Sequence, residues 1–327
     1  MKHHGDRPFF AMPYPGIFRV TSPLPFPGLD HVHVYIAEGP SGGLVVIDTT
    51  LGILDSFDRI EQGIRWLDRK LTDIERIILT HAHPDHIGLA AALQDASGAE
   101  VVCHPICHEM MLGMRTPERW EHIGRSYAAH GWTPTPEAIR GGGFPIPPNV
   151  VHVREGERLH FAGTAWDVHW TPGHEWGHIV FFRPGDRLLI AGDTLLAKIT
   201  PHIGYMVDPP DPLGMFLESL KHIEALEAAF VLPMHGRPFE EATERARAIA
   251  AHHQQRLRRI VDIFVRRGAV PAIDVSEELF GRNLMHFEER LALAETLSHL
   301  EHLRLAGRLR RELQDGVYRY ELDRPVG

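Results

Sequence analysis

The sequence contains very little cysteine. Only two cysteines occur among 327 residues, Cys103 and Cys107, both within the segment VVCHPICHE. So small a number excludes a disulfide framework and a cysteine-rich zinc module. Together with His104 and His108 the pair offers atoms that could bind a metal ion, but a buried strand end leading into a helix explains the segment more simply.

Long apolar runs are also missing. No run reaches the ~18 residues that a membrane-spanning helix needs. The N-terminal segment MKHHGDRPFF lacks the charged, apolar and small-residue order of a signal peptide. We therefore expect a cytoplasmic protein with no membrane partner.

Basic residues are fewer than acidic ones. The formal net charge is −9, and most of the acidic excess lies in residues 1–240. An acidic surface repels phosphate, so we do not expect nucleic acid as the main partner. Residues 241–327 are close to neutral and include the run RLAGRLRR at 304–311, which leaves a local nucleic-acid site open. A solvated helix face accounts for these arginines equally well.

Apolar runs and turns alternate along the chain in a way that is typical of a layered α/β domain. Within the first hundred residues, strands are predicted at 32–38, 44–48, 74–80 and 99–104. Helices are predicted between them at 54–70 and 87–97. Further strands are predicted at 165–174, 178–183, 187–194 and 231–236, and a helix at 215–230. We expect one large domain over residues 1–240.

Two segments differ from this alternation. Residues 105–150 are helical in pattern and rich in Met and Trp, which predicts either a lid over a pocket or a peripheral helical pair. After a linking helix at 241–267, residues 268–327 have the order helix, helix, hairpin, with Asp315–Gly316 at the hairpin turn. That order is compatible with a small winged-helix-like domain. The helix at 288–306 could also pack against a second copy in a homo-oligomer.

Ligand-type side chains follow four of the predicted strands. A single HxH motif is often a surface accident, but four clusters in equivalent places are not. Loops at one edge of an α/β sheet converge, so we expect these side chains to meet. They are five imidazoles and two carboxylates: His81, His83, Asp85, His86, His174, Asp193 and His235.

This ligand set predicts a site for two metal ions. Imidazole and carboxylate suit zinc above all, and also manganese or iron. Seven ligands exceed one tetrahedral site, which favours two divalent ions if one carboxylate bridges them. Such a pair can share a hydroxide that attacks a carbonyl or a phosphorus atom.

The segments THAHPDH, TPGHEWGH, GDT and MHG, in this order, resemble the metallo-β-lactamase superfamily over roughly residues 15–240. The resemblance implies a four-layer αββα sandwich with a di-metal site at one edge, and some members end in a winged-helix-like domain. It assigns His81, His83 and His174 to one metal and Asp85, His86 and His235 to the other, with Asp193 as the bridge. Asp48 and His178 would support these ligands from behind.

The resemblance also implies a hydrolase with a small-molecule substrate. Asp85 would act as the catalytic residue that orients the hydroxide and takes its proton. Lactonases of the superfamily often carry Tyr three residues after the bridging aspartate, where this chain has Leu196; Tyr205 is a candidate substitute, and His202 a second candidate substrate contact.

The predicted substrate is a thioester or ester, acyl-CoA-like or glyoxalase II-like, because an apolar lid suits an acyl chain. The alternatives are a ribonuclease or phosphodiesterase, a lactonase, and a metal-sensing nucleic-acid-binding protein without enzymatic activity.

Overall fold

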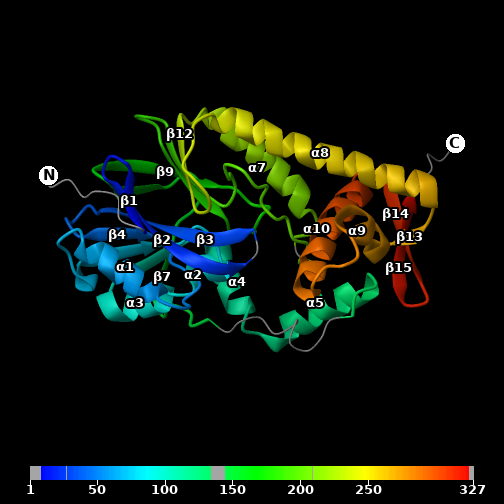
Figure 1. Ribbon diagram of the computed structural model, residues 1–327, viewed down its shortest axis with the longest axis horizontal. Helices are drawn as coiled ribbons and strands as arrows, with labels where there is room; N and C mark the ends of the chain where they lie inside the picture. Colours follow the sequence, from blue (N-terminus) through cyan, green and yellow to red (C-terminus); the bar gives the residue numbers. More distant parts are fainter. Residues whose placement is uncertain (1–8, 27, 134–143, 208, 324–327) are drawn as a thin grey trace.

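Two β-sheets packed against each other form the centre of the molecule (Figure 1). The computed structural model describes residues 9–26, 28–133, 144–207 and 209–323. The first sheet has the strand order β1-β2-β3-β4-β5-β6-β7, antiparallel up to β4 and parallel from β4 onward. Its strands are Phe10–Tyr14, Ile17–Phe26, Leu29–Glu38, Leu44–Ile47, Ile74–Ile78, Glu100–Cys103 and Val150–His152.

The second sheet has the order β12-β11-β10-β9-β8. Only its β11–β12 pair is parallel. From β8 to β12 its strands are Arg158–Phe161, Thr164–Trp170, Ile179–Arg183, Leu188–Gly192 and Phe230–Pro233.

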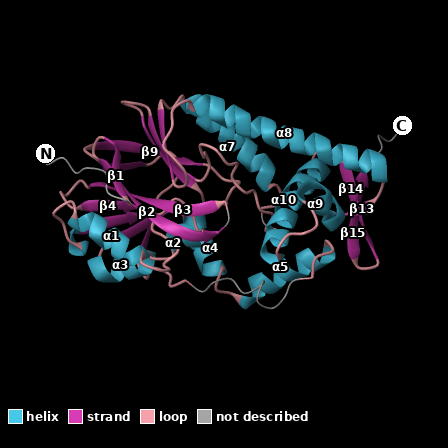
Figure 2. Cartoon of the chain, in the orientation of Figure 1, coloured by secondary structure: helices cyan, strands magenta, loops and turns pink. Residues whose placement is uncertain are grey.

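Helices cover the outer face of each sheet (Figure 2). On the first sheet lie α1 (Ser56–Arg65) and α3 (Ala90–Ser97). On the second lies α7 (Pro212–Leu226). The layers are therefore helix, sheet, sheet, helix, which confirms the predicted αββα arrangement.

The strands have continuous apolar runs because both of their faces are buried. In β4, Leu44 and Val46 pack toward the helices, while Val45 and Ile47 pack between the sheets. The side chains of β10 alternate in the same way, so that one apolar row faces the helices and the other faces the opposite sheet. Burial on both sides fixes the register of these strands and hence the position of the loops that follow them.

The structure differs from the sequence prediction at several boundaries. Strands β1 and β2 were not predicted. The helix predicted at 54–70 ends at Arg65, since the chain turns back through Asp68, whose φ is 58°. The helix predicted at 87–97 is divided into the short α2 (Pro84–Ile87) and α3. A one-turn helix, η1 (Leu71–Asp73), leads into β5.

The predicted lid segment contains α4 (Pro105–Gly113) and α5 (Pro117–Ala129). Both begin with a proline, which suits the first turn of a helix because its missing N–H has no partner to lose. Part of the predicted segment, residues 134–143, lies outside the described residues.

The C-terminal part begins with the long helix α8 (Ala242–Arg267), which runs from the second sheet to the far end of the molecule (Figure 1). Two helices and a three-stranded antiparallel sheet follow: β13 (Val270–Pro271), α9 (Ala272–Phe280), α10 (His286–Leu305), β14 (Leu309–Gln314) and β15 (Val317–Leu322). At the turn between β14 and β15, Asp315 and Gly316 have φ values of 52° and 83°, which confirms the predicted hairpin. The winged-helix comparison stays a prediction.

This C-terminal part shares its core with the larger domain. One apolar cluster contains Phe216 and Leu220 of α7 together with Leu297 and Leu300 of α10. No described helix is long and apolar enough to cross a membrane.

Candidate metal centre

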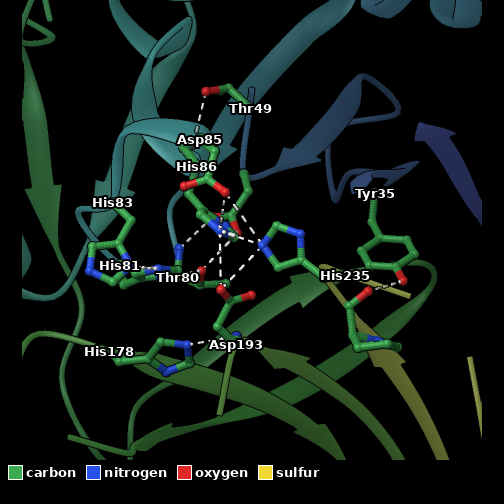
Figure 3. A network of polar contacts seen from close by, with 12 residues as sticks. Tyr35, Thr49, Thr80, His81, His83, Asp85, His86, His178, Asp193 and His235 are labelled. Carbon is green, nitrogen blue, oxygen red and sulfur yellow. Dashed lines mark hydrogen bonds and ion pairs between the residues drawn. The ribbon is translucent and has the colours of Figure 1, made fainter. Parts of the chain in front are cut away.

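The predicted ligand residues converge at one edge of the two sheets, and Figure 3 labels all of them except His174. Each lies in a loop or a short helix that follows a buried strand. His81 and His83 follow β5, and Asp85 and His86 lie on α2. The others follow β9, β11 and β12, and are His174, Asp193 and His235.

One group consists of His81, His83 and His174, whose nearest ring nitrogens all lie within 4.8 Å of one another. His81 Nε2 is 3.0 Å from His83 Nδ1. The His83 and His174 rings meet edge to face, with centroids 4.5 Å apart. Three imidazoles gathered in this way could hold one metal ion.

The second group consists of Asp85, His86 and His235, whose ligand atoms also lie within 4.8 Å of one another. His235 Nε2 is 3.3 Å from His86 Nε2 and 3.4 Å from Asp85 Oδ2. Two imidazoles and a carboxylate could hold a second ion.

Asp193 lies between the two groups. Its Oδ2 is 3.5 Å from His174 Nε2 and 3.5 Å from His86 Nε2. The same oxygen is 3.2 Å from His235 Nε2. Asp193 Oδ1 and His174 Nε2 are both buried without a hydrogen-bond partner. Such orphaned atoms are rare in folded proteins, and a bound cation would satisfy both, so the residues present fit a metal centre.

Hydrogen bonds behind the rings aim the ligand atoms at the centre. His174 Nδ1 donates to the His202 carbonyl oxygen at 2.8 Å, and His235 Nδ1 donates to the His31 carbonyl oxygen at 2.7 Å. A carbonyl oxygen only accepts, so Nδ1 carries the proton and Nε2 keeps its lone pair for a metal.

Asp48 orients the His86 ring in the same way, through Nδ1. Its buried Oδ2 lies 2.8 Å from His86 Nδ1 and accepts a hydrogen bond from Thr80 Oγ1 at 2.7 Å. Its Oδ1 accepts from the Thr80 N–H at 2.6 Å. Asp48 has a φ of 56°, a conformation that costs energy in a residue other than glycine and is typical of functional sites.

His178 lies behind Asp193 rather than among the ligand atoms (Figure 3). Its Nε2 accepts the Asp193 N–H at 3.0 Å, and its Nδ1 is 2.9 Å from Thr171 Oγ1 and 3.0 Å from Thr194 Oγ1. Both ring nitrogens are therefore occupied. A side chain at Gly192 would collide with this ring, since an added Cβ would lie 2.4 Å from His178 Nε2.

The electrostatics of the site favour a cation. Burial holds the pKa of His81 and of His83 well below the ordinary value, so both rings are neutral and can act as ligands. Burial would raise the pKa of Asp193, but the neighbouring His235 and His86 outweigh it and hold this pKa well below its usual range. The buried carboxylate is thus ionised.

A cavity of about 580 Å³ opens from this centre. His83 and His174 lie in its wall, while Asp193 is not among the lining residues. Helices α4 and α5 contribute one side, and α10 of the C-terminal part contributes another. The apolar residues among those that line it include Met110, Met114, Trp120, Met206, Phe287 and Leu291.

The two predicted substrate contacts have different positions. His202 lines the cavity. Tyr205 does not, which corrects that prediction: it is 6% exposed, and its carbonyl oxygen accepts a hydrogen bond from Tyr127 at 2.8 Å. Its N–H donates to the Ala294 carbonyl oxygen at 3.1 Å.

Sequence reasoning missed the contribution of α10. Glu295 Oε2 accepts the Ile203 N–H at 2.7 Å, and Ser298 Oγ donates to the Ile203 carbonyl oxygen at 2.6 Å. His202 Nε2 lies 3.0 Å from the Leu291 carbonyl oxygen. The segment that orients His174 is therefore fastened to a helix about a hundred residues further along the chain. No sequence signal could have found this link, since it depends on tertiary packing alone.

Two packed sheets with such a donor set at one edge define a metallo-hydrolase type of protein. Residues 27–235 match the family described as the metallo-beta-lactamase superfamily. Residues 257–323 match the family described as the metallo-beta-lactamase-like C-terminal domain. The chain belongs to the metallo-beta-lactamase superfamily and is a metal-dependent hydrolase.

Individual relatives agree with this assignment. A metallo-beta-lactamase family protein from Thermus thermophilus is 34% identical with a TM-score of 0.83, over 94% of this chain and 99% of that one. A beta-lactamase domain protein from Burkholderia ambifaria is 27% identical with a TM-score of 0.86, over 98% and 96%. A probable metallo-hydrolase of Bacillus subtilis is 24% identical over 87% of this chain and 91% of its own. A hydroxyacylglutathione hydrolase of Rhizobium meliloti is 27% identical over 50% of this chain and 51% of its own.

Proposed function

We propose that the chain is a dinuclear metal-dependent hydrolase of apolar acyl thioesters or esters. His81, His83 and His174 would hold one ion, Asp85, His86 and His235 the other, and Asp193 both. We propose zinc as the metal, although manganese or iron would accept the same ligands. Two such ions supply an activated water and a polarised carbonyl oxygen.

The observation that best supports an acyl substrate is the cavity beside the metal centre. Its wall is largely apolar and reaches His83 and His174 directly. Burying an acyl chain against an apolar wall is favourable. The carbonyl group at the end of that chain would then lie beside the residues that would hold the metal ions. Met110 of α4, Trp120 of α5 and Phe287 of α10 belong to this apolar surface.

Asp85 is the proposed proton acceptor. Its carboxylate is 13% exposed, the more accessible of the two ligand carboxylates, and its Oδ2 lies 3.4 Å from His235 Nε2. A carboxylate in this position can orient the attacking water and receive its proton.

The relatives support the thioester more than the other substrates. Two of them, from Rhizobium meliloti and Pseudomonas aeruginosa, are named hydroxyacylglutathione hydrolase. Their matches span only about half of this chain or less, so the name supports the type of reaction and not the leaving group.

The arginines of the run at 304–311, which had favoured the nucleic-acid alternative, are mostly paired with carboxylates. Arg304 and Arg311 both pair with Glu301 at 2.8 Å. Arg310 pairs with Glu321 at 2.8 Å. These arginines are neutralised by their own domain and do not form a free stripe for phosphates. Replacing Arg308, Arg310 and Arg311 by Ala would abolish salt-sensitive RNA binding if the alternative were true.

The direct test is a panel of chromogenic thioesters, esters, lactones and phosphodiesters assayed on one preparation of known metal content. We expect hydrolysis of a hexanoyl thioester, its loss on treatment with EDTA, and its return with zinc. Activity confined to lactones or phosphodiesters would overturn the proposed substrate class. A folded, metal-loaded protein with no activity on the whole panel would instead favour the metal-sensing alternative.

A further inference from the structure

Two arginines interrupt the apolar wall of the cavity. Arg119 comes from α5 in the lid segment, and Arg290 from α10 in the C-terminal part. Both are partly buried. They therefore bring charge to the same cavity from two elements that are far apart in the sequence.

Neither guanidinium has a carboxylate partner within ion-pair distance among the described residues, although many arginines elsewhere do. The Arg290 guanidinium lies over the Phe287 ring, 5.5 Å from the ring centroid. A partly desolvated guanidinium without a partner is costly, and an anion that supplies oxygen atoms would remove that cost.

The described part of the cavity wall has little negative charge of its own. The single carboxyl group among its described lining residues is Glu175, which is 4% exposed. Its Oε1 accepts the Gly177 N–H at 2.9 Å, and burial raises its pKa. The arginines therefore dominate the charge of the wall outside the metal centre.

Arg290 lies near the metal-centre end of the cavity. The next residue on α10, Leu291, has its carbonyl oxygen 3.0 Å from His202 Nε2. His202 in turn holds His174 through its carbonyl oxygen. An anionic group bound by Arg290 would consequently belong to the same molecule whose carbonyl reaches the ligand residues.

We infer that Arg119 and Arg290 form an anion-binding subsite, so that the preferred substrate is an apolar acyl thioester or ester that carries a carboxylate or phosphate away from the scissile bond. The inference rests on the proposed function for the reaction itself, but the subsite stands on the cavity and its charges. Nucleic acid is not the occupant, because the remaining wall is largely apolar and offers no further described arginine or lysine for a phosphate backbone.

Three thioesters distinguish where the anionic group lies. The neutral reference is the hexanoyl thioester of N-acetylcysteamine. The second has the adipoyl group instead, which places a carboxylate at the end of the acyl chain. The third is the hexanoyl thioester of phosphopantetheine, which places a phosphate on the leaving group. We expect kcat/KM for one anionic thioester to exceed that of the reference by about tenfold, the size of one charge-assisted hydrogen bond.

Charge-removing variants assign this preference to the arginines. In Arg119→Gln and Arg290→Gln the ratio of anionic to neutral kcat/KM should fall about tenfold, mainly through KM. Arg115→Gln is the matched control, since Arg115 is an exposed arginine of the same lid that does not line the cavity. A wild-type enzyme without preference for either anionic thioester, or variants that keep the preference, would overturn the inference.

A binding measurement separates this result from the reaction. Titration calorimetry of the metal-loaded protein compares the affinity for 1-octanesulfonate with the affinity for 1-octanol. The sulfonate is chosen because it is an anion that binds metals weakly. We expect the sulfonate to bind about tenfold more tightly than the alcohol, and this difference to disappear in the Arg119→Gln, Arg290→Gln double variant. If no thioester is hydrolysed but this difference is found, the proposed reaction fails and the subsite stands. Equal binding of sulfonate and alcohol by the wild type overturns the subsite.

Discussion

Among the described residues, two buried histidine clusters are similar in composition and differ in their hydrogen bonding. One is the metal centre. The other lies between α8 and α10, where His253, Glu295 and His299 also bring their ligand atoms within 4.8 Å of one another. By proximity alone, both could hold a metal ion.

In the α8–α10 cluster the atoms that face one another are paired, and of its three side chains only His253 has a buried atom, Nε2, without a hydrogen-bond partner. Glu295 Oε1 accepts a hydrogen bond from Arg256 at 2.5 Å, and its Oε2 accepts the Ile203 N–H at 2.7 Å. His253 Nδ1 is 3.1 Å from His299 Nε2, and His299 Nδ1 donates to the Glu295 carbonyl oxygen at 2.7 Å. The cluster therefore fastens two helices together.

In the metal centre the hydrogen bonds lie on the far side of the rings. Partners such as His202 and Asp48 occupy Nδ1, while His174 Nε2 and Asp193 Oδ1 remain without any. The comparison teaches that unpaired atoms on more than one ligand, together with access to a cavity, distinguish a metal site from a gathering of imidazoles.

The sharpest test of this contrast replaces one histidine in each cluster. His83→Ala should lower kcat/KM for the thioester by about 10³-fold or more, because losing an ion removes several kcal/mol of transition-state stabilisation. His253→Gln should keep full metal content and most of the activity. Metal analysis and steady-state kinetics on both variants check this. Equal metal loss in the two would erase the distinction between the clusters.

The second test removes the carboxylate of the α8–α10 cluster. Glu295→Ala leaves the partly buried Arg256 charge unpaired and removes the acceptor of the Ile203 N–H, so stability should fall, by less than the about 3–5 kcal/mol that breaking a fully buried pair costs. Urea denaturation measures the loss. Glu244→Ala, at an exposed position of α8, the helix that carries Arg256, is the control and should change stability little. If Glu295→Ala were as stable as the wild type, this cluster would not be the structural fastening described above.

A smaller effect is expected from the residue behind His86. Asp48→Asn keeps the shape but weakens the hold on His86 Nδ1 and Thr80, so metal affinity should fall by about 10- to 100-fold. Competition with a chelator of known affinity measures it. An unchanged affinity would mean that the strained Asp48 does not contribute to metal binding.

The weakest effect concerns acid stability. Burial chiefly lowers the pKa of His253 from 6.5 to about 3. Between these values the unfolded chain binds a proton that the folded chain does not, so the stability present above pH 6.5 is lost as the pH falls. One such group contributes a slope of about 1.4 kcal/mol per pH unit at most. Denaturation at pH 7 and pH 5 should show a shallower loss in His253→Gln than in the wild type; parallel losses would contradict this role.

The ligand residues were predictable from the sequence because each follows a buried strand, and strand ends meet at one sheet edge. Placing Asp48 and His178 behind them required the resemblance to the superfamily. The layers were predictable for a similar reason, since the apolar runs of β4, β5 and β10 require cover on both faces.

The cavity wall was not predictable. Helix α10 is buried over most of its middle, from Ala292 to Glu301, so its periodicity does not indicate which face meets the lid. Glu295 and His299 are buried at positions where their residue types predict exposure. Tyr205 was proposed from the spacing of another branch of the superfamily, but packing against α10 and α5 turns it away from the cavity.

The most direct test of the central claim is an anomalous-difference map from zinc-loaded crystals, recorded at the zinc absorption edge. The account predicts two peaks, one on each side of Asp193 Oδ2, and none between His253 and His299. A single peak at the centre, or a peak in the α8–α10 cluster, would contradict it.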